Sequence, residues 1–577
     1  MSSPERRLNT AVLVIGTGGS GLRAAIEIAE RGVEVLAVGK RPTSDAHTSL
    51  AAGGINAALG TMDPDDSWEQ HAADTIKESY LLADPRVVEI VTRGAARGID
   101  DLQRYGMKFA LEQDGRVSQR YFGAHTFRRT AFAGDYTGLE IQRALVSRAA
   151  SLRIPILDTV YITRLLVDDG AIFGAYGFDI VTGERLIIIA DTVVLAAGGH
   201  TRIWRRSSSR RDENTGDSWR LAVEAGCRIR DPELVQFHPS GLIEPEDAAG
   251  TLVSEAARGE GGVLRNALGE RFMQRYDADR MELSTRDRVA LASFTEIREG
   301  RGTLNGGVWL DVSHLPRDVI LTRLPRVHQL LLELQIRDIT QEAMEVAPTA
   351  HYSMGGIWVR PDDHSTGVEG LYAIGEASSG LHGANRLGGN SLIELLVYGR
   401  IVGEAAAARS SRIAVQRRSP ASIAAARDEV DQMLGADGAE NVRALQRSIR
   451  DVMTDHVGVV RDERGLRKAI AELDQIEGRV AEIGVHPDIA GYQDLCHAFD
   501  LKASVLAARA TTEAAIERRE TRGCHNRSDF PEIDPTLQGN LVWAGPGVIT
   551  MEPLAPIPDA IAALMKADVS TTSKLLE

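Results

Sequence analysis

Histidine and arginine side chains stand in three short, glycine-rich segments of the chain, at residues 236–241, 350–356 and 382–392. Arginine presents a planar fork of donors that suits a carboxylate, and histidine and serine can also donate hydrogen bonds. A charged ligand can be buried only where opposite charge and donors compensate for its lost hydration. We therefore expect Arg386, His238, His351 and the Ser254 hydroxyl to bind an anionic carboxylate ligand. Taken singly, each also fits a buried structural role.

Charged residues in two further segments have patterns typical of ion pairs. Thr285-Arg286-Asp287 is typical of a helix start with an ion pair, and Glu255 and Arg258 stand in the charged segment 254–262. Structural ion pairs have the same residue pattern as catalytic ones, so charge alone assigns no role. His47 lies in a small, glycine-rich stretch, where a single histidine is often simply solvated.

The element expected to position these groups lies near the start of the chain. Residues 11–15 and 33–38 are apolar runs typical of strands, and residues 22–31 have helical periodicity. A turn containing Gly16, Gly18, Gly19 and Gly21 joins the first strand to the helix. Such glycines let the backbone approach a pyrophosphate at a helix N-terminus. The unit predicts a dinucleotide site, with a tight structural turn as the alternative.

The expected dinucleotide is FAD. NAD-binding units carry an acidic residue about 20 residues further on, at the end of the second strand. Gly39 and Lys40 stand there instead, which argues against NAD.

The rest of the chain predicts the domain organisation. Residues 192–196 and 371–374 are apolar strands that end near glycine, whereas helical periodicity dominates after about residue 415, notably over 442–457 and 466–480. The predicted fold class is α/β, with a Rossmann-like FAD-binding domain, an inserted α+β capping domain, a helical domain and a C-terminal segment. The predicted ranges are 1–235 with 350–415, then 236–349, 416–528 and 529–577. Residues 205–212 are interpreted as a solvated loop, with a partner or phosphate contact as the alternative.

Composition excludes several classes of protein. The chain has 577 residues and a net charge of −15, so sequence-independent nucleic-acid binding is disfavoured. The sequence contains no run of 18 apolar residues, so no membrane span is predicted. Its start lacks the apolar stretch of a secretory signal peptide, so a cytosolic protein is expected. Three cysteines exclude a disulfide framework and a four-thiolate iron–sulfur cluster within the chain.

At its motifs the chain resembles the flavoprotein subunit of succinate dehydrogenase and fumarate reductase. His47-Thr48 precedes an Ala-x-Gly-Gly stretch, as in that family. The other similar segments are HxxDTxK at 71–77, NTGD at 214–217, QFHPxG at 236–241, ExxRGEGG at 255–262, RDxV at 286–289, HYxMGG at 351–356, HGANRLGGNSL at 382–392 and ExRGxHxR at 520–527. Ser240 and Ser254 stand where the family usually has threonine, which keeps the hydroxyl. The helical and C-terminal parts match less well.

The resemblance implies roles for individual residues. His47 is the implied covalent attachment point of FAD, and no metal site is expected. The implied FAD-binding residues are Gly16, Gly18, Gly19, Gly21, Lys40, His47, Thr48, Gly53, Gly54, Asp217, Glu376, Ser391 and Leu392. The implied substrate-binding residues are His238, Ser254, His351, Arg386 and Phe122. Arg286 is the implied proton-transfer residue, with Glu255 and Arg258 as its relay.

The implied activity is the oxidation of succinate to fumarate, with a hydride passing to FAD and a proton to Arg286. Electrons are then expected to pass to a separate iron–sulfur subunit, then on to quinone. Membrane-anchor subunits would hold the chain at the cytoplasmic face of the cell membrane.

Three alternatives stay open at this point. The same site could work mainly as a fumarate reductase. L-aspartate oxidase shares many motifs, but it lacks the flavin-linking histidine and typically has Ala-Ser where Gly388-Gly389 stand here. A non-catalytic FAD-binding scaffold would have no need of the histidines and arginines together.

Overall fold

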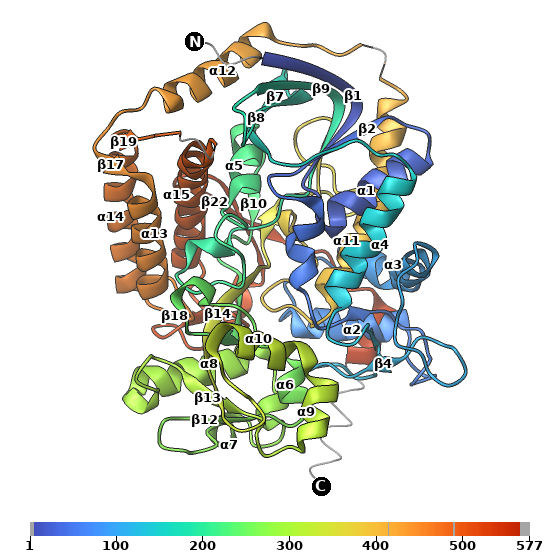
Figure 1. Ribbon diagram of the computed structural model, residues 1–577, viewed down its shortest axis with the longest axis vertical. Helices are drawn as coiled ribbons and strands as arrows, with labels where there is room; N and C mark the ends of the chain where they lie inside the picture. Colours follow the sequence, from blue (N-terminus) through green and yellow to red (C-terminus); the bar gives the residue numbers. More distant parts are fainter. Residues whose placement is uncertain (1–4, 414, 488–490, 566–577) are drawn as a thin grey trace.

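The computed structural model describes residues 5–413, 415–487 and 491–565. Its central feature is a seven-stranded mixed sheet in the order β6-β2-β1-β9-β8-β7, with β16 also paired to β9 (Figure 1). Strands β6, β2, β1, β9 and β16 are parallel, whereas β7, β8 and β9 pair antiparallel. The bounds are β1 Glu5–Ile15, β2 Val35–Val38, β6 Ile156–Leu157, β7 Val160–Asp168, β8 Ala171–Asp179, β9 Arg185–Leu195 and β16 Leu371–Ala373.

Both faces of this sheet are buried, so its central strands read as continuous apolar runs. In β1, Val12 and Val14 face one hydrophobic core, and Leu13 and Ile15 face the other. Helices α1 (Gly19–Glu30) and α11 (Asn390–Ser410) cover the first face. They approach closely because Gly399 lies against α1, where a Cβ atom would stand 2.8 Å from the Cβ of Arg23. The same face carries α2 Trp68–Glu78, α3 Pro85–Arg104 and α4 Thr137–Ser151.

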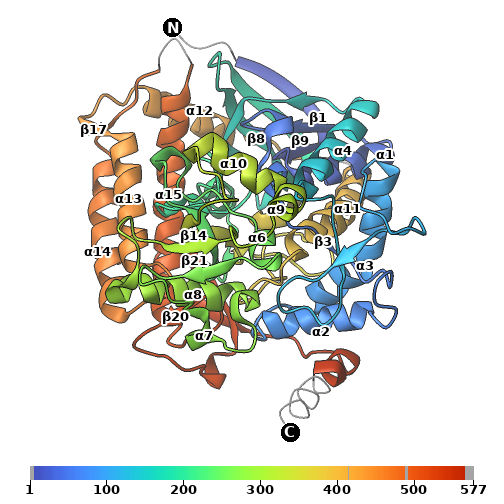
Figure 2. The same ribbon diagram turned by 60° about the horizontal axis from the view of Figure 1, so that its bottom comes forward.

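A second, antiparallel sheet in the order β11-β14-β13-β12 belongs to the segment predicted as the capping domain. It lies at the bottom of Figure 1 and comes forward in Figure 2. The bounds are β11 Val235–Leu242, β12 Val263–Arg265, β13 Val308–Asp311, β14 Met344–Ser353, α6 Ala256–Gly259, α7 Met273–Tyr276, α8 Arg286–Glu296, α9 Arg317–Arg323 and α10 Pro325–Gln335. These elements enclose a hydrophobic core of their own.

Helices dominate the following part of the chain, as the sequence predicts. They are α12 Pro420–Leu434, α13 Val442–His456, α14 Glu463–Val480 and α15 Gln493–Glu517. Helices α13, α14 and α15 pack side by side at the left of Figure 1. Their apolar faces extend the hydrophobic core that Leu13 and Ile15 of β1 face, which also contains residues of α5 (Asp217–Glu224).

The C-terminal segment is held to the middle of the chain by a four-stranded sheet in the order β15-β10-β21-β22. Its bounds are β10 Ile229–Arg230, β15 Gly356–Ile357, β21 Gly539–Gly545 and β22 Val548–Pro553. The mixed α/β fold class is therefore confirmed, while the predicted domain boundaries stay predictions. In the part of the chain that the structure describes, the helices are too short or too polar to span a bilayer.

Candidate active site

A cavity of about 740 Å³ joins the glycine-rich turn after β1 to the capping elements. All but two of the predicted site residues line it, although they come from segments far apart in the sequence. They are Gly16, Gly18, Gly19, Lys40, His47, Thr48, Gly53, Gly54, Phe122, Asp217, His238, Ser254, Glu255, Arg286, His351, Glu376, Arg386, Ser391 and Leu392. The two residues outside this lining are Gly21 and Arg258.

The turn between β1 and α1 requires glycine for two different reasons. Gly16 has φ +112, and a Cβ atom there would lie 2.2 Å from the Ala196 carbonyl oxygen. At Gly21 a Cβ atom would lie 1.9 Å from the Gly16 carbonyl oxygen. Gly21 therefore allows α1 to pack on the turn, rather than lining the cavity as a cofactor-binding residue would. Gly18, the N-cap of α1, has no side chain, and the Gly19 N–H donates to Thr48 Oγ1 at 2.9 Å. The other backbone N–H groups at this helix start are suited to an anion.

Lys40 and Asp217 add a charged pair beside this turn. Lys40 Nζ lies 3.0 Å from Asp217 Oδ2 and 3.6 Å from Asp500 Oδ1. Burial opposes the charge of Lys40, but the two carboxylates hold the pKa of Lys40 above its ordinary value. The other oxygen of Asp217, Oδ1, is buried without a hydrogen-bond partner among the described residues. A ligand hydroxyl would satisfy this acceptor, so the turn, the cavity and Asp217 together fit FAD.

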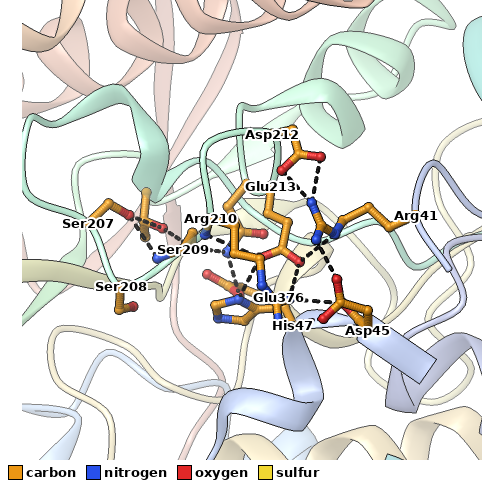
Figure 3. Close-up of polar contacts among 12 residues, drawn as sticks. Arg41, Asp45, His47, Ser207, Ser208, Ser209, Arg210, Asp212, Glu213 and Glu376 are labelled. Carbon is orange, nitrogen blue, oxygen red and sulfur yellow. Dashed lines mark hydrogen bonds and ion pairs between the residues drawn. The ribbon is translucent and has the colours of Figure 1, made fainter. Parts of the chain in front are cut away.

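His47, in the 3₁₀ turn His47–Leu50, faces a carboxylate that the sequence analysis did not single out (Figure 3). Its Nδ1 atom lies 3.1 Å from Glu213 Oε2. Burial lowers the pKa of His47, but the Glu213 carboxylate outweighs burial and raises it. Burial raises the pKa of Glu213, but the contact with His47 outweighs burial and lowers this pKa to about 2. With the Nδ1 proton donated to Glu213, the neutral ring leaves Nε2 with a free lone pair.

Glu213 is fixed in turn by a network of charges. Arg210 Nη1 donates to Glu213 Oε1 at 2.9 Å, and Arg210 Nη2 lies 2.7 Å from Asp45 Oδ1 (Figure 3). The interpretation of residues 205–212 as a solvated loop is wrong for part of this segment. Ser207 and Ser209 are buried, and their hydroxyl groups both form hydrogen bonds with the Thr201 hydroxyl. The Ser209 hydroxyl also accepts a hydrogen bond from Asn214 Nδ2.

At the capping end, Arg286 begins α8 and pairs with Glu255. Arg286 Nε and Nη2 lie 2.8 Å and 2.7 Å from Glu255 Oε2. Burial raises the pKa of Glu255, but Arg286 and Arg258 outweigh it and hold that pKa well below its usual range. Arg258 stands behind Glu255, with Nη2 3.8 Å from Oε1, and donates to the Glu282 carbonyl. The structure thus aligns the three predicted proton-transfer residues in order.

The two site histidines are neutral donors or acceptors. Burial is the main reason why the pKa of each ring lies well below its ordinary value. The positive charge of Arg286 lowers the pKa of His238 further, and that of Arg386 lowers the pKa of His351 further. His238 Nδ1 accepts the backbone N–H of Ser240 at 3.2 Å, so the neutral ring carries its proton on Nε2. The ring centroids of His238 and His351 lie 5.4 Å apart. His238 can therefore donate a hydrogen bond to a ligand without carrying charge.

Arg386 is bound by neutral groups alone among the described residues. Its Nη1 donates to Ser391 Oγ at 2.7 Å and its Nη2 to Gln236 Oε1 at 2.9 Å, while its guanidinium lies over the Tyr352 ring. Burial, reinforced by Arg286, lowers the pKa of Arg386 to about 10, which still leaves it charged at neutral pH. Its Nε has no hydrogen-bond partner in the described chain. Ser391, predicted to bind FAD, lines the cavity and also accepts this hydrogen bond from Arg386.

Two other predicted substrate residues lie close to these groups. Phe122 packs between Gly53 and Gly388, where added Cβ atoms would lie 2.7 Å and 3.0 Å from its ring. The Ser254 hydroxyl accepts the backbone N–H of Ala256 at 3.2 Å, at the start of α6. Gln236 was not among the predicted site residues, although it belongs to the QFHPxG segment. Its signal is a polar residue two positions before His238, which places both side chains on the same face of strand β11.

The comparisons with known proteins agree with this geometry. The chain matches the family models "FAD binding domain" over residues 11–392 and "Fumarate reductase flavoprotein C-term" over residues 446–547. It is 41% identical over 534 residues to a subunit of the fumarate reductase (CoM/CoB) of Methanothermobacter marburgensis, covering 92% of this chain and 96% of that protein. It is 34% identical over 590 residues to a succinate dehydrogenase flavoprotein subunit of Rickettsia bellii, covering 96% and 97%.

A solved structure, "Mycobacterium smegmatis Sdh1 in complex with UQ1", matches with a TM-score of 0.88 and 38% identity over 96% of both chains. The similarity extends over nearly the whole length of this chain and of these three relatives. The chain belongs to the succinate dehydrogenase and fumarate reductase flavoprotein family.

Proposed function

We propose that this chain oxidises succinate to fumarate with FAD attached covalently to His47. One observation carries the proposal: Glu255 lies between Arg286 and Arg258, whereas Arg386, which shares the Gln236 oxygen with Arg286, has no carboxylate hydrogen-bonded to it among the described residues. A guanidinium without a carboxylate partner, beside a second one that is only partly compensated, suits a ligand with two carboxylates. FAD bound in the adjoining cavity would supply the hydride acceptor.

Different side chains are suited to bind the two carboxylates of the substrate. Arg386, with two donors engaged and Nε free, is suited to grip one carboxylate together with His351. His238 Nε2–H and the Ser254 hydroxyl are suited to the other. Phe122 closes the space beside Gly53 and Gly388 and limits the room for water. Fixing both carboxylates would orient the carbon between them for the reaction.

Arg286 is the proposed proton-transfer residue. In the oxidation, a proton leaves the carbon next to the hydride donor and passes to Arg286, then to Glu255 and Arg258. The close Arg286–Glu255 contacts support this order. Arginine is already protonated at neutral pH, so Arg286 can accept the substrate proton only as it gives up a proton of its own to Glu255.

Fumarate reduction is the second candidate, and a specific observation favours it. A guanidinium that is protonated at neutral pH can donate a proton directly, so the reductive direction needs no neutral arginine. The relative from Methanothermobacter marburgensis is named a fumarate reductase. A single set of groups serves both directions, because the forward and reverse reactions share one transition state.

We further propose that electrons leave through an iron–sulfur partner subunit, from which they pass on to quinone. Membrane-anchor subunits would hold this assembly at the cytoplasmic face of the cell membrane. The relative of known structure is described in complex with UQ1, which supports a quinone as the final acceptor.

Two measurements test the proposal. Purified protein is denatured in SDS and examined for flavin fluorescence at 62.5 kDa, and the native protein is assayed for succinate-dependent reduction of a dye. Flavin that stays with the wild-type chain but not with His47→Ala supports the covalent link. Dye reduction absent from the wild type and from its complex with partners would refute the activity.

A further inference from the structure

One neutral amide, on strand β11, bridges the two arginines of the candidate site. The side chain of Gln236 is completely buried. Its Oε1 accepts from Arg386 Nη2 at 2.9 Å and from Arg286 Nη1 at 3.3 Å. Its Nε2 donates to Asn385 Oδ1 at 3.0 Å and to the Arg386 carbonyl at 3.1 Å. Only this orientation of the amide satisfies all four contacts, because a flipped amide would oppose donor to donor and acceptor to acceptor.

Asn385 holds the amide in this orientation. It is also buried, and its Nδ2 donates to Glu78 Oε1 at 2.7 Å and to Asp287 Oδ1 at 3.0 Å. Asp287 directly follows Arg286 in α8, so the hydrogen bonds close a ring that begins and ends at the start of this helix. A buried polar network in which each member is satisfied has a single preferred geometry.

The neutrality of Gln236 matters as much as its geometry. A carboxylate at this place would bind both arginines more strongly, but it would cancel one positive charge and oppose the oxygen of Asn385. Glu255 already offsets one charge of the arginine group. A second carboxylate would leave too little positive charge to bind a dianion.

From this we infer that Gln236 is a positioning residue for dicarboxylate binding. It fixes Arg286 and Arg386 relative to each other through one amide oxygen and adds no negative charge that would compete with the substrate for them. The inference rests on the proposed function, since it assumes that the ligand is a dicarboxylate.

The test uses the FAD-loaded protein and two variants, Gln236→Glu and Gln236→Met. Binding of malonate is measured by calorimetry, with acetate as the singly charged comparison. Malonate has two carboxylates but a single carbon between them, so it cannot be dehydrogenated. Steady-state kinetics with succinate and fumarate complete the comparison.

Gln236→Glu changes charge at nearly constant size. Because Coulomb energy scales with ligand charge, the logarithm of the affinity loss should be about twice as large for malonate as for acetate. We expect malonate to bind about 10- to 100-fold more weakly, as for a lost charge-assisted hydrogen bond. Equal losses for malonate and acetate, or no loss, would overturn the inference, since packing alone changes no charge.

Gln236→Met keeps neutrality but removes the amide oxygen. We expect a KM for succinate at least about tenfold higher together with a lower kcat, because Arg286 and Arg386 lose their shared acceptor. This variant tests the inference even if Gln236→Glu does not fold. An unchanged KM and kcat would refute the role of Gln236 in positioning the two arginines. Gln446→Glu is the matched control, since Gln446 lies on α13, bonded to the His497 carbonyl, and should bind malonate as the wild type does.

The outcomes separate this inference from the proposed function. Wild-type protein that neither binds malonate nor turns over succinate or fumarate refutes the proposed function, and the inference falls with it. Wild-type protein that does both, with variants that behave like it, refutes the inference alone.

Discussion

The contact between His47 and Glu213 leads to a prediction about covalent flavin attachment: Glu213→Gln should slow it. Glu213 Oε1 accepts from Arg210 Nη1, while Oε2 accepts from the Arg210 backbone N–H and lies 3.1 Å from His47 Nδ1 (Figure 3). A glutamine is neutral and has a single acceptor oxygen for these donors. The Nδ1 proton of His47 therefore loses its anionic acceptor, which destabilises the tautomer that leaves the Nε2 lone pair free for attachment.

The size of the effect follows from the bond that is lost. A hydrogen bond to a charged group contributes about 1.5–3 kcal/mol, which corresponds to about 10- to 150-fold in rate at alkaline pH. The pH dependence should change as well. Glu213 raises the pKa of His47, so in the wild type attachment declines as the pH falls through this raised pKa and the ring takes up a proton. Without the carboxylate that decline should occur at lower pH.

The assay follows covalent flavin with time after FAD is added to chain produced without it. In-gel fluorescence measures attached flavin, and filtration measures total bound FAD at several pH values. Asp45→Asn is the matched control, because Asp45 pairs with Arg210 but does not touch His47. Attachment by Glu213→Gln at the wild-type rate across the pH range, or equal slowing by Asp45→Asn, would refute the reasoning.

Four further outcomes are expected. Arg286→Lys keeps the charge but loses the two-point contact with Glu255, so kcat should fall about 10²- to 10⁴-fold, with a smaller change in KM for succinate, in steady-state kinetics. Arg386→Lys should instead mainly raise KM, by about tenfold or more. Gly21→Ala forces a Cβ atom onto the Gly16 carbonyl, so FAD content and thermal midpoint should fall together, by about 1–3 kcal/mol in stability. Arg518→Met leaves the buried carboxylate of Glu233 without its arginine, so unfolding should become easier by about 3–5 kcal/mol in denaturant titrations.

Much of the fold could be predicted because local patterns determined it. The apolar runs at 11–15 and 33–38 and the helical periods at 442–457 and 466–480 correspond to β1, β2, α13 and α14. Each of these elements carries its own signal of period or composition. The antiparallel hairpin of β7 and β8 was not predicted, although Asp169-Gly170 between its strands, with φ 50 and φ 75, is typical of a two-residue hairpin turn.

The partners of the site residues could not be predicted from sequence. Glu213 meets His47 across 166 residues, and Gln236 meets Arg386 across 150. No local pattern encodes such contacts, because they arise only when the sheet and the capping elements assemble. The interpretation of residues 205–212 failed for the same reason. A serine- and arginine-rich composition favours solvent, but Ser207 and Ser209 gain buried partners from other segments.

The hydrogen-bond partners also distinguish two arginines that the sequence cannot separate. Arg286 is engaged by an anion, Glu255, so it has a carboxylate positioned to exchange a proton with. Arg386 is engaged by the neutral Ser391, Gln236 and Tyr352, and its Nε is free among the described residues. An uncompensated guanidinium with a free donor is suited to bind a carboxylate, whereas a compensated one is suited to pass a proton along. We therefore expect the two arginines of this site to differ in role because their neighbours differ in charge.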